Sequence, residues 1–384
     1  MREFSASWID NNGDLWLFGG WGMVVSVATG KSSNSGDQND LWKFDLSTGE
    51  WACMRANGET QTEYGERGIP GIYDSQGDPD DRNAPGGRDH AAGWTDRSGN
   101  LWLFGGTGRD SINQLGNLND LWEFDQSSSA WAWIGGGESL HCNESHQCGL
   151  SGVYGKLGKH DAKNWPGGRT SAASWTDAEG GFWLFGGNGF DAKGNSGPLN
   201  DLWRFTSSTR EWIWMNGSTI TGPGFIRSLG ISVNNPRGSY GTLGLPSPTN
   251  APGGRDGASS WTDRDGNLWL FGGQGYDAVG HSGYLNDLWE YRFLPATPRA
   301  EAPTFSQVGG TYSKTQYLRI ADPTPDSAIF YTLDGTAPTT MSIKYATGIT
   351  IAKTTTVRAI AIASGYEKSE VATATYTIVT VPTH

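Results

Sequence analysis

The motif Phe-Gly-Gly occurs four times in this chain at intervals of 81 to 86 residues, each time directly after a Trp-Leu pair. About twenty residues after each copy stands a second motif, Asn-Asp-Leu-Trp. Self-similarity at a fixed period is typical of repeat folds, in which each unit buries its apolar face against its neighbours. The Phe-Gly-Gly copies lie at 18–20, 104–106, 185–187 and 271–273, and the Asn-Asp-Leu-Trp copies at 39–42, 119–122, 200–203 and 286–289.

The residues around these motifs predict four short strands per unit, named a to d. Strand a ends in Trp, as at Trp175, and a turn with Asp and Gly connects it to strand b, Leu-Trp-Leu-Phe. Strand c is Asp-Leu-Trp-x-Phe/Tyr, and strand d carries Trp, as at Trp131 and Trp133. The 57 glycines and 12% aromatic residues suit strands and turns rather than helices, so we expect an all-β fold.

The Gly-Gly after strand b, the Asn-Asp-Leu-Trp-x-Phe-Asp of strand c and the Trp of strand d resemble the kelch repeat family over roughly residues 2–293. The resemblance implies a kelch-type β-propeller, here with four blade repeats whose Trp side chains pack between blades. An insert of about 30 residues, with Gly-x-Tyr and Asn-x-Pro-Gly-Gly-Arg motifs, precedes strand a in units 2 to 4. We expect the strand-b tryptophans to be buried at equivalent positions: Trp16, Trp102, Trp183 and Trp269.

The first unit begins at strand a, and the fourth has no strand d. Because an open strand edge invites aggregation, we expect an incomplete ring in this sequence and further residues before Met1. A signal peptide would belong to those residues, since the first eight contain no apolar segment. The blade number of the complete ring is left open.

After a Pro-rich segment the composition shifts to Thr, Ile, Val and Tyr in alternation. The stretches Gly310-Thr-Tyr312 and Ile329-Phe-Tyr-Thr-Leu-Asp-Gly-Thr-Ala-Pro338 resemble the chitobiase/β-hexosaminidase C-terminal domain. That resemblance implies a small immunoglobulin-like β-sandwich, an accessory module of secreted proteins without catalytic residues of its own. The expected organisation is a propeller over 1–293, a linker over 294–301 and a β-sandwich over 302–384.

The b–c and d–a connections are the long ones, and in a four-stranded meander both leave from the same end of the sheet. Long loops on one side of a rigid scaffold are typical of binding surfaces. Residues that differ between units are the better candidates, because most ligands are asymmetric. The candidates, which would stack on sugar rings or a peptide or else pack within their own loops, are Trp21, Arg109, Phe190, Tyr276 and Trp165.

An arginine precedes the Trp of strand a by six residues in every unit. Because strand a is the innermost strand, we expect these arginines to ring the mouth of the central channel on the long-loop face, where one interpretation is an anion site. Pairing with Glu3, Asp89, Asp256 or loop carbonyls is the structural alternative, and we favour it. The four residues are Arg2, Arg88, Arg169 and Arg255.

The sequence Gly-Gly-x-Gly-x-Asp follows strand b in units 2 to 4 and matches the start of a calcium-binding nonapeptide. It does not recur every nine residues, which excludes that β-roll. The aspartates either shape an Asx-turn, which we favour, or hold a calcium ion together with loop carbonyls. No other cofactor is expected. The aspartates are Asp110, Asp191 and Asp277.

Two of the three cysteines, Cys142 and Cys148, lie six residues apart in one loop. A metal site would add His141 and His146, but the spacing fits no standard zinc pattern. We therefore expect a local disulfide, with Cys53 free, and an extracellular or cell-surface location.

The net charge of −12 argues against a nucleic-acid partner, and no apolar stretch of membrane-spanning length is present. Galactose oxidase also uses kelch-type blades, but the six histidines here do not recur at blade-equivalent positions as a copper site would need. The favoured function is an extracellular binding or adhesion module that recognises a glycan or protein through the long-loop face. The alternative, suggested by the C-terminal resemblance, is a carbohydrate-active enzyme or its accessory part.

Overall fold

The computed structural model describes residues 2–25, 32–55, 69–221, 225–226, 231–232, 236–293 and 298–379. The chain divides into two compact units, Met1–Arg292 and Phe293–His384. All of the regular secondary structure in the described residues is β-strand, which confirms the all-β prediction. Of the expected linker, residues 294–297 lie outside the described residues. Pro298 and Ala300 exchange backbone hydrogen bonds with Glu367, so this end of the expected linker belongs to the second unit.

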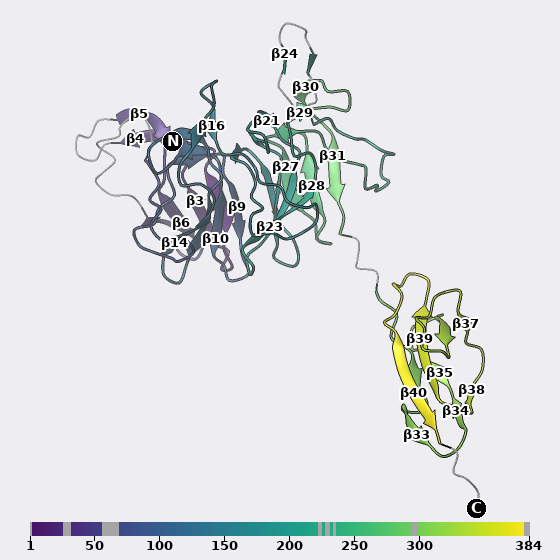
Figure 1. Ribbon diagram of the computed structural model, residues 1–384. Coiled ribbons are helices and arrows are strands. Elements are labelled where there is room, and N and C mark those ends of the chain that lie inside the picture. Colours follow the sequence, from purple (N-terminus) through teal and green to yellow (C-terminus); the bar gives the residue numbers. More distant parts are fainter. Residues whose placement is uncertain are drawn as a thin grey trace, which may run out of the picture. The chain divides into compact units, whose positions relative to one another are not determined.

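The first unit contains four meander sheets, which we call modules 1 to 4, with strands ordered a-b-c-d by hydrogen bonding. Figure 1 shows them side by side in chain order, with β3 and β6 at one side and β31 at the other. Module 4 has three strands. The strands are β2 (Ala6–Ile9), β3 (Leu15–Phe18), β6 (Leu41–Asp45) and β7 (Glu50–Arg55); β9 (Ala92–Thr95), β10 (Leu101–Phe104), β13 (Leu121–Asp125) and β14 (Ala130–Gly135); β18 (Ala173–Thr176), β19 (Phe182–Phe185), β22 (Leu202–Thr206) and β23 (Glu211–Asn216); and β27 (Ser259–Thr262), β28 (Leu268–Phe271) and β31 (Leu288–Tyr291).

The core lies between consecutive modules, because alternate residues of strand b point to opposite neighbours. Trp16 and Phe18 of module 1 are buried against Leu101 and Leu103 of module 2. Modules 2 and 3 repeat the same packing, and so do modules 3 and 4. Of the strand-b tryptophans, Trp16, Trp102 and Trp183 are buried, and Trp269 is half-buried on the outer side of module 4.

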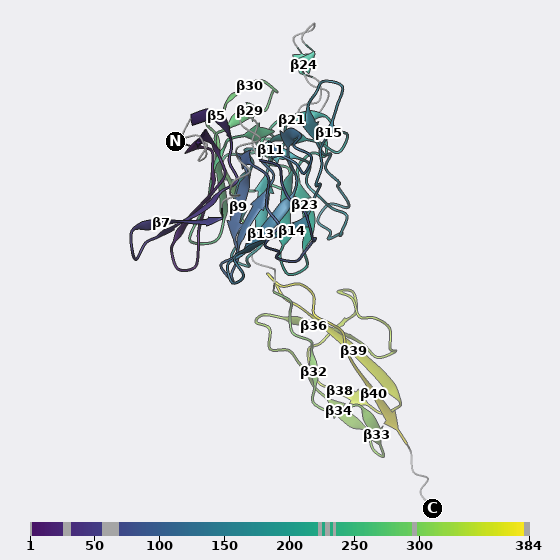
Figure 2. The same ribbon diagram turned by 90° about the vertical axis from the view of Figure 1, so that its left-hand side faces the viewer.

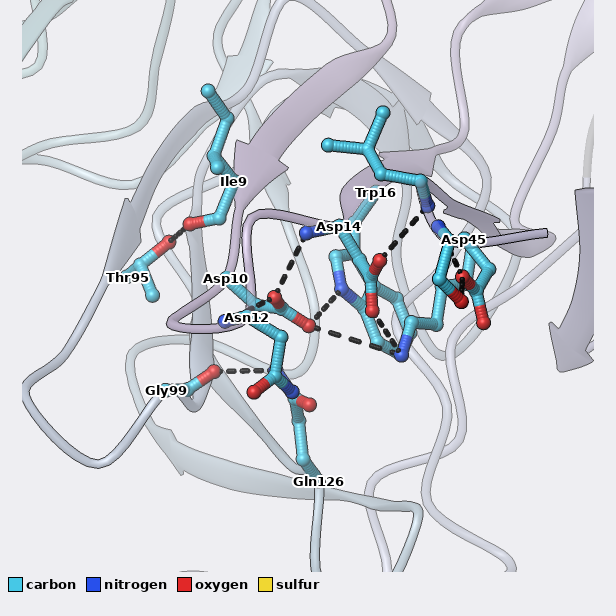
Figure 3. A network of polar contacts seen from close by, with 12 residues as sticks. Ile9, Asp10, Asn12, Asp14, Trp16, Asp45, Thr95, Gly99 and Gln126 are labelled. Atoms are coloured by element: carbon cyan, nitrogen blue, oxygen red, sulfur yellow. Dashed lines mark hydrogen bonds and ion pairs between the residues drawn. The ribbon is translucent and has the colours of Figure 1, made fainter. Parts of the chain in front are cut away.

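A carboxylate holds the a–b turn of every module at the end opposite the long loops. In module 1, Asp10 Oδ1 accepts the amides of Asn12 and Asp14, and Asp10 Oδ2 accepts the indole N–H of Trp16 at 2.9 Å (Figure 3). This carboxylate therefore fixes both the turn and the rotamer of the core Trp. The equivalent aspartates, which bind Trp102, Trp183 and Trp269 in the same way, are Asp96, Asp177 and Asp263.

The long-loop end carries a second set of small sheets, the end ribbons, each made of a two-residue strand and the hairpin of the b–c connection. Figures 1 and 2 both show β5, β21, β29 and β30 at this one end of the unit. The ribbon strands are β1 (Arg2–Glu3), β4 (Trp21–Val25) and β5 (Ser32–Asp37); β8 (Arg88–Asp89), β11 (Thr107–Arg109) and β12 (Leu115–Asn117); β17 (Arg169–Thr170), β20 (Asn188–Phe190) and β21 (Ser196–Pro198); and β26 (Arg255–Asp256), β29 (Gln274–Tyr276) and β30 (Ser282–Tyr284).

Three further pairings complete the first unit. The hairpin of β15 (His141–Cys142) and β16 (Cys148–Gly149) extends the ribbon of module 2, with Gly149 parallel to Asn117. β24 (Phe225–Ile226) pairs with β25 (Ile231–Ser232).

The second unit has its own core, centred on Leu318, Val357, Ala359 and Tyr376, all fully buried. Its main sheet has the order β33-β40-β39-β36-β37, and the pairs β32-β35 and β34-β38 complete it. The strands are β32 (Thr304–Phe305), β33 (Gly310–Tyr312), β34 (Gln316–Leu318), β35 (Ile320–Ala321), β36 (Ala328–Thr332), β37 (Ile343–Lys344), β38 (Ile349–Ile351), β39 (Thr355–Ile362) and β40 (Ala372–Ile378).

Candidate functional site

The repeated arginines form the short strands of the end ribbons and do not begin strand a. A residue with positive φ follows each of these strands and separates it from strand a: Phe4, His90, Ser171 and Gly257. Backbone hydrogen bonds connect these residues from module to module, from His90 N to Phe4 O, from Ser171 N to His90 O and from Gly257 N to Ser171 O, at 2.9 to 3.0 Å. The start of every module is therefore tied to the start of the next.

Three of the four arginines are buried in ion pairs and also donate to loop carbonyls, as in the structural alternative that we favour over an anion site: Arg88, Arg169 and Arg255. Arg88 donates to both carboxylate oxygens of Asp120 at 2.6 and 2.7 Å, and Arg169 and Arg255 bind Asp201 and Asp287 in the same way. Arg2 pairs with Asp40 at the partly exposed ribbon of module 1. The partner is the Asp of Asn-Asp-Leu-Trp, and not the acid beside each Arg.

The Tyr of the d–a insert completes this buried network. Tyr73 donates its hydroxyl to Asp120 Oδ2 at 2.6 Å, and the indole of Trp122 donates to the same oxygen. Tyr154 binds Asp201 similarly, and Tyr240 binds Asp287. Burial, followed by the charge of Asp120, raises the pKa of Tyr73 well above its ordinary value, so Tyr73 stays a neutral donor. The Tyr of the Gly-x-Tyr motif thus has a structural role, because it binds the Asp of the Arg–Asp pair.

Strand alternation places the residue after each Arg on the opposite face of its ribbon. Three directly opposed residues then form a row across each ribbon. In module 1 the row is Glu3, Trp21 and Asp37. The corresponding rows are Asp89, Thr107 and Asn117 in module 2, Thr170, Asn188 and Pro198 in module 3, and Asp256, Gln274 and Tyr284 in module 4. These rows, and not the arginines, carry the variable polar groups of this end.

The ribbons of modules 1 and 2 contribute carboxylates, a histidine and exposed aromatic rings. His90 Nδ1 lies 2.8 Å from Asp89 Oδ1, and the ring of Phe4 stacks on the His90 ring at 3.9 Å between centroids. Phe4 is 52% exposed and Trp21 is 40% exposed. Apolar rings beside groups that donate and accept hydrogen bonds suit recognition of a polyhydroxylated ligand.

Asp37 lies opposite Trp21 on the ribbon of module 1. Its side chain is buried, and burial together with the nearby charge of Asp89 raises the pKa of Asp37 to about 7, against the opposing effect of Arg109. Near neutral pH this carboxyl therefore carries a proton part of the time and can donate as well as accept a hydrogen bond. Asp37, Asp89 and His90 were absent from the ligand-binding prediction, because the strand of Arg88 and Asp89 is only two residues long and gives no sequence pattern that marks them.

The five predicted ligand residues are separated by the fold. Trp21 and Arg109 lie on the ribbons of modules 1 and 2, the first exposed and the second half-buried, with Arg109 donating to Asn113 O. Phe190 is buried and packs on Gly149 of the β15–β16 hairpin, where a Cβ atom would collide with its ring.

Trp165 is half-buried, donates to Asn119 O at 2.7 Å and packs against Trp212. Phe190 and Trp165 therefore pack against other segments of the first unit and have a structural role. Tyr276 lies half-buried on β29 of module 4. Ligand binding by Trp21, Arg109 and Tyr276 stays a prediction.

The aspartates proposed as calcium ligands close their hairpins through backbone amides. Asp110 Oδ1 accepts from Ile112 N and Gln114 N, and its Oδ2 accepts from Leu140 N at 2.7 Å. Asp191 and Asp277 form the same Asx-type turns. The structure thus gives these carboxylates a turn-forming role. Within the described ranges, no group of three or more His, Cys, Asp or Glu side chains is placed to hold a metal ion.

Cys142 and Cys148 form a disulfide across the β15–β16 hairpin, and Cys53 on β7 is a free, exposed thiol. The part of the chain that the structure describes contains no helix of the length and apolar character needed to cross a membrane.

Comparison with known proteins finds a family model that is similar to one part of the chain. Residues 307–373 match the model of the chitobiase/beta-hexosaminidase C-terminal domain, which supports the resemblance drawn from the sequence. No curated protein matches the chain.

Two solved structures are similar at low identity. The first, "Structure of YjhT", is 15% identical with a TM-score of 0.37, and the match covers 71% of this chain and 60% of that one. The second, a "Novel fungal alcohol oxidase with catalytic diversity among the AA5 family, in complex with copper", is 9% identical with a TM-score of 0.24 and is covered over 98% of both chains. The present chain thus spans less than two thirds of the first of these proteins.

Proposed function

We propose that the first unit is an extracellular, propeller-like scaffold that binds a glycan at its long-loop end, around the ribbons of modules 1 and 2. The observation that carries the proposal is the stack of the exposed Phe4 ring on His90, which lies beside Asp89, together with the exposed ring of Trp21 on the ribbon of module 1. Aromatic faces cover the apolar faces of sugar rings, and carboxylate and imidazole groups bind their hydroxyls.

The second unit supports a glycan as the ligand, since residues 307–373 match a domain named after two carbohydrate-processing enzymes. The disulfide between Cys142 and Cys148 supports an oxidising, extracellular compartment. The acidic composition, with a net charge of −12, argues for a neutral or cationic glycan rather than a polyanionic one.

The experiment is a glycan array with the full chain, followed by calorimetry with the best ligand. Trp21→Ala and Phe4→Ala should each weaken binding at least tenfold. Val279→Ala, which truncates an equally exposed side chain of module 4, should leave the Kd unchanged. Loss of binding in Tyr317→Ala of the second unit, with no effect at Trp21 or Phe4, would assign the glycan to the C-terminal domain instead.

The binding proposal further expects the glycan to be recovered intact after incubation with the protein. Release of shorter fragments would favour the enzyme alternative and would direct attention to Asp37, whose raised pKa suits a proton donor.

A further inference from the structure

A groove of about 690 Å³ lies at one edge of the second unit, and its size is within the range of about 300–1,000 Å³ that is typical of small-molecule sites. Its walls come from β36 and β37 of the main sheet, from β38 of the smaller pair and from the loops that follow β36 and β38. Within the described part of this unit, β37 is the last strand of its sheet and β38 pairs only with β34. The groove therefore lies between two sheet edges.

The floor of the groove is a part of the core-facing surface of the main sheet that the smaller pair leaves uncovered. Ala359, Tyr331 and Ile343 are directly opposed on β39, β36 and β37, so they form one row on the same face of the sheet. Along this row the exposure rises from 0% at Ala359, through half-buried Tyr331, to 55% at Ile343. Ile351 of β38, only 2% exposed, lines the opposite wall. Apolar groups bound in the groove would therefore extend the core of this unit.

Two opposite charges line the same groove, one in each of its loops. Asp334, in the loop after β36, accepts from the amide and the hydroxyl of Thr336 through Oδ1 at 3.0 and 2.6 Å, and its Oδ2 has no hydrogen-bond partner among the described residues. These bonds lower the pKa of Asp334 and keep it ionised at neutral pH. Lys353, in the loop after β38, forms no ion pair with any carboxylate of the described residues. The groove thus offers one carboxylate and one ammonium group around an apolar floor.

We propose that this groove binds a short apolar peptide with free ends. The ammonium group of the peptide binds Asp334, and its carboxylate binds Lys353. Its apolar side chains cover the row of Tyr331 and Ile343. Charge complementarity selects this occupant, because a zwitterion with apolar side chains matches both charges and the floor between them, whereas an uncharged ligand would leave both charges without a counter-ion. The proposal concerns the second unit alone and does not rest on the glycan site of the first unit.

The experiment measures binding of the dipeptide Leu-Leu to the full chain by calorimetry and ligand-observed NMR. We expect Leu-Leu to bind. Gly-Gly, which has the same charges without apolar side chains, should not bind at the same concentration. N-acetyl-Leu-Leu and Leu-Leu amide each lack one of the two charges, and each should bind about tenfold more weakly, as the loss of one hydrogen bond between charged groups implies.

Substitutions then match each end of the peptide to one side chain. Lys353→Met should bind Leu-Leu no better than Leu-Leu amide, because the group that distinguishes the two is gone. Asp334→Asn, which keeps the Oδ1 acceptor of its turn, should likewise lose the distinction between Leu-Leu and N-acetyl-Leu-Leu. Ile343→Ser should weaken the binding of all three peptides. The matched control is Lys344→Met, which should bind as the wild type does, since Lys344 is exposed and lies opposite Phe330 on the other face of β37 from Ile343.

Three results would overturn the proposal. The first is no binding of Leu-Leu to the wild-type protein at millimolar concentration. The second is equal binding of Leu-Leu and its two blocked forms. The third is an equal loss of binding in Lys353→Met and Lys344→Met, with melting temperatures that show both variants to be folded. The glycan site is tested separately, because Trp21→Ala in the first unit should leave the binding of Leu-Leu unchanged.

Discussion

Arg88 and Asp120 form a two-bond ion pair in which both side chains are completely shielded from solvent. The remaining donors of Arg88 bind Gly86 O and Gly105 O. Every side-chain nitrogen of Arg88 and both carboxylate oxygens of Asp120 thus have a hydrogen-bond partner, which is the condition under which a buried pair is tolerated. The pair joins the end ribbon of module 2 to the start of strand c.

Replacing Asp120 by Ala should destabilise the first unit by about 3–5 kcal/mol, because the charge of Arg88 would stay buried without a partner. Urea unfolding monitored by tryptophan fluorescence measures this loss. Arg82→Ala removes the exposed ion pairs of Arg82 with Asp74 and Asp80 and should cost less than about 1 kcal/mol. Equal effects of the two substitutions would show that the Arg88–Asp120 pair is not buried in solution.

Tyr73→Phe should cost about 1.5 kcal/mol, since it removes one hydrogen bond to a buried charged group and leaves the ring in place. The matched control is Tyr240→Phe, which removes the same bond to Asp287 in module 4, where Tyr240 is exposed. The control should cost clearly less. Chemical denaturation of both variants gives the comparison, and a larger loss at Tyr240 would contradict it.

The strand-a Trp of each of modules 1 to 3 donates its indole N–H to a backbone carbonyl of the next module. Substitution of this Trp should therefore cost more stability where it is buried than where it is exposed. Trp94→Phe removes a buried donor to Trp183 O and should lower the free energy of unfolding by about 1–3 kcal/mol. Trp261→Phe, at the exposed face of module 4, should change the stability of the isolated chain much less. Thermal unfolding of both variants and of the wild-type protein measures the difference in stability.

Much of the first unit was predictable because strand-length patterns recur. The repeated Trp-Leu-Phe-Gly-Gly fixed strand b, and the alternation within Leu101 to Phe104 indicated side chains on both faces. The Asn-Asp-Leu-Trp motif likewise predicted strand c, whose Leu and Trp are buried in modules 2 and 3. Local periodicity carries such information directly.

The arginine contacts could not be read from local patterns. Arg88 and Asp120 stand 32 residues apart, and two intervening hairpins bring them together. The strand of Arg88 is only two residues long and ends at the left-handed residue His90, so it offers no periodicity to detect. The burial of Phe190 has a related cause, since Gly149 of the inserted β15–β16 hairpin packs against its ring. Contacts between inserts are set by tertiary packing.

Asp37 predicts an unusual dependence of stability on pH. Its pKa is raised from 3.8 to about 7 by burial and by Asp89, so the folded protein holds this proton more tightly than the unfolded chain does. The resulting stabilisation is complete below the unfolded pKa and is lost as the pH rises toward about 7. The other charged groups facing Asp37 are Arg88 and Arg109, with His90 beside Asp89.

Asp37→Asn should therefore match the wild-type stability near pH 4 and exceed it by about 1 kcal/mol at pH 8, where the like charges of Asp37 and Asp89 repel each other. The difference in the free energy of unfolding between variant and wild type is the quantity to follow by urea unfolding across this range. Asp263→Asn is the control of opposite sign. The indole of Trp269 lowers the pKa of Asp263, so this substitution should destabilise the protein at neutral pH and lose its effect in acid. An Asp37→Asn variant that is less stable than wild type at pH 8 would mean that the ionised Asp37 carboxylate is stabilised by Arg109 more than it is opposed by Asp89.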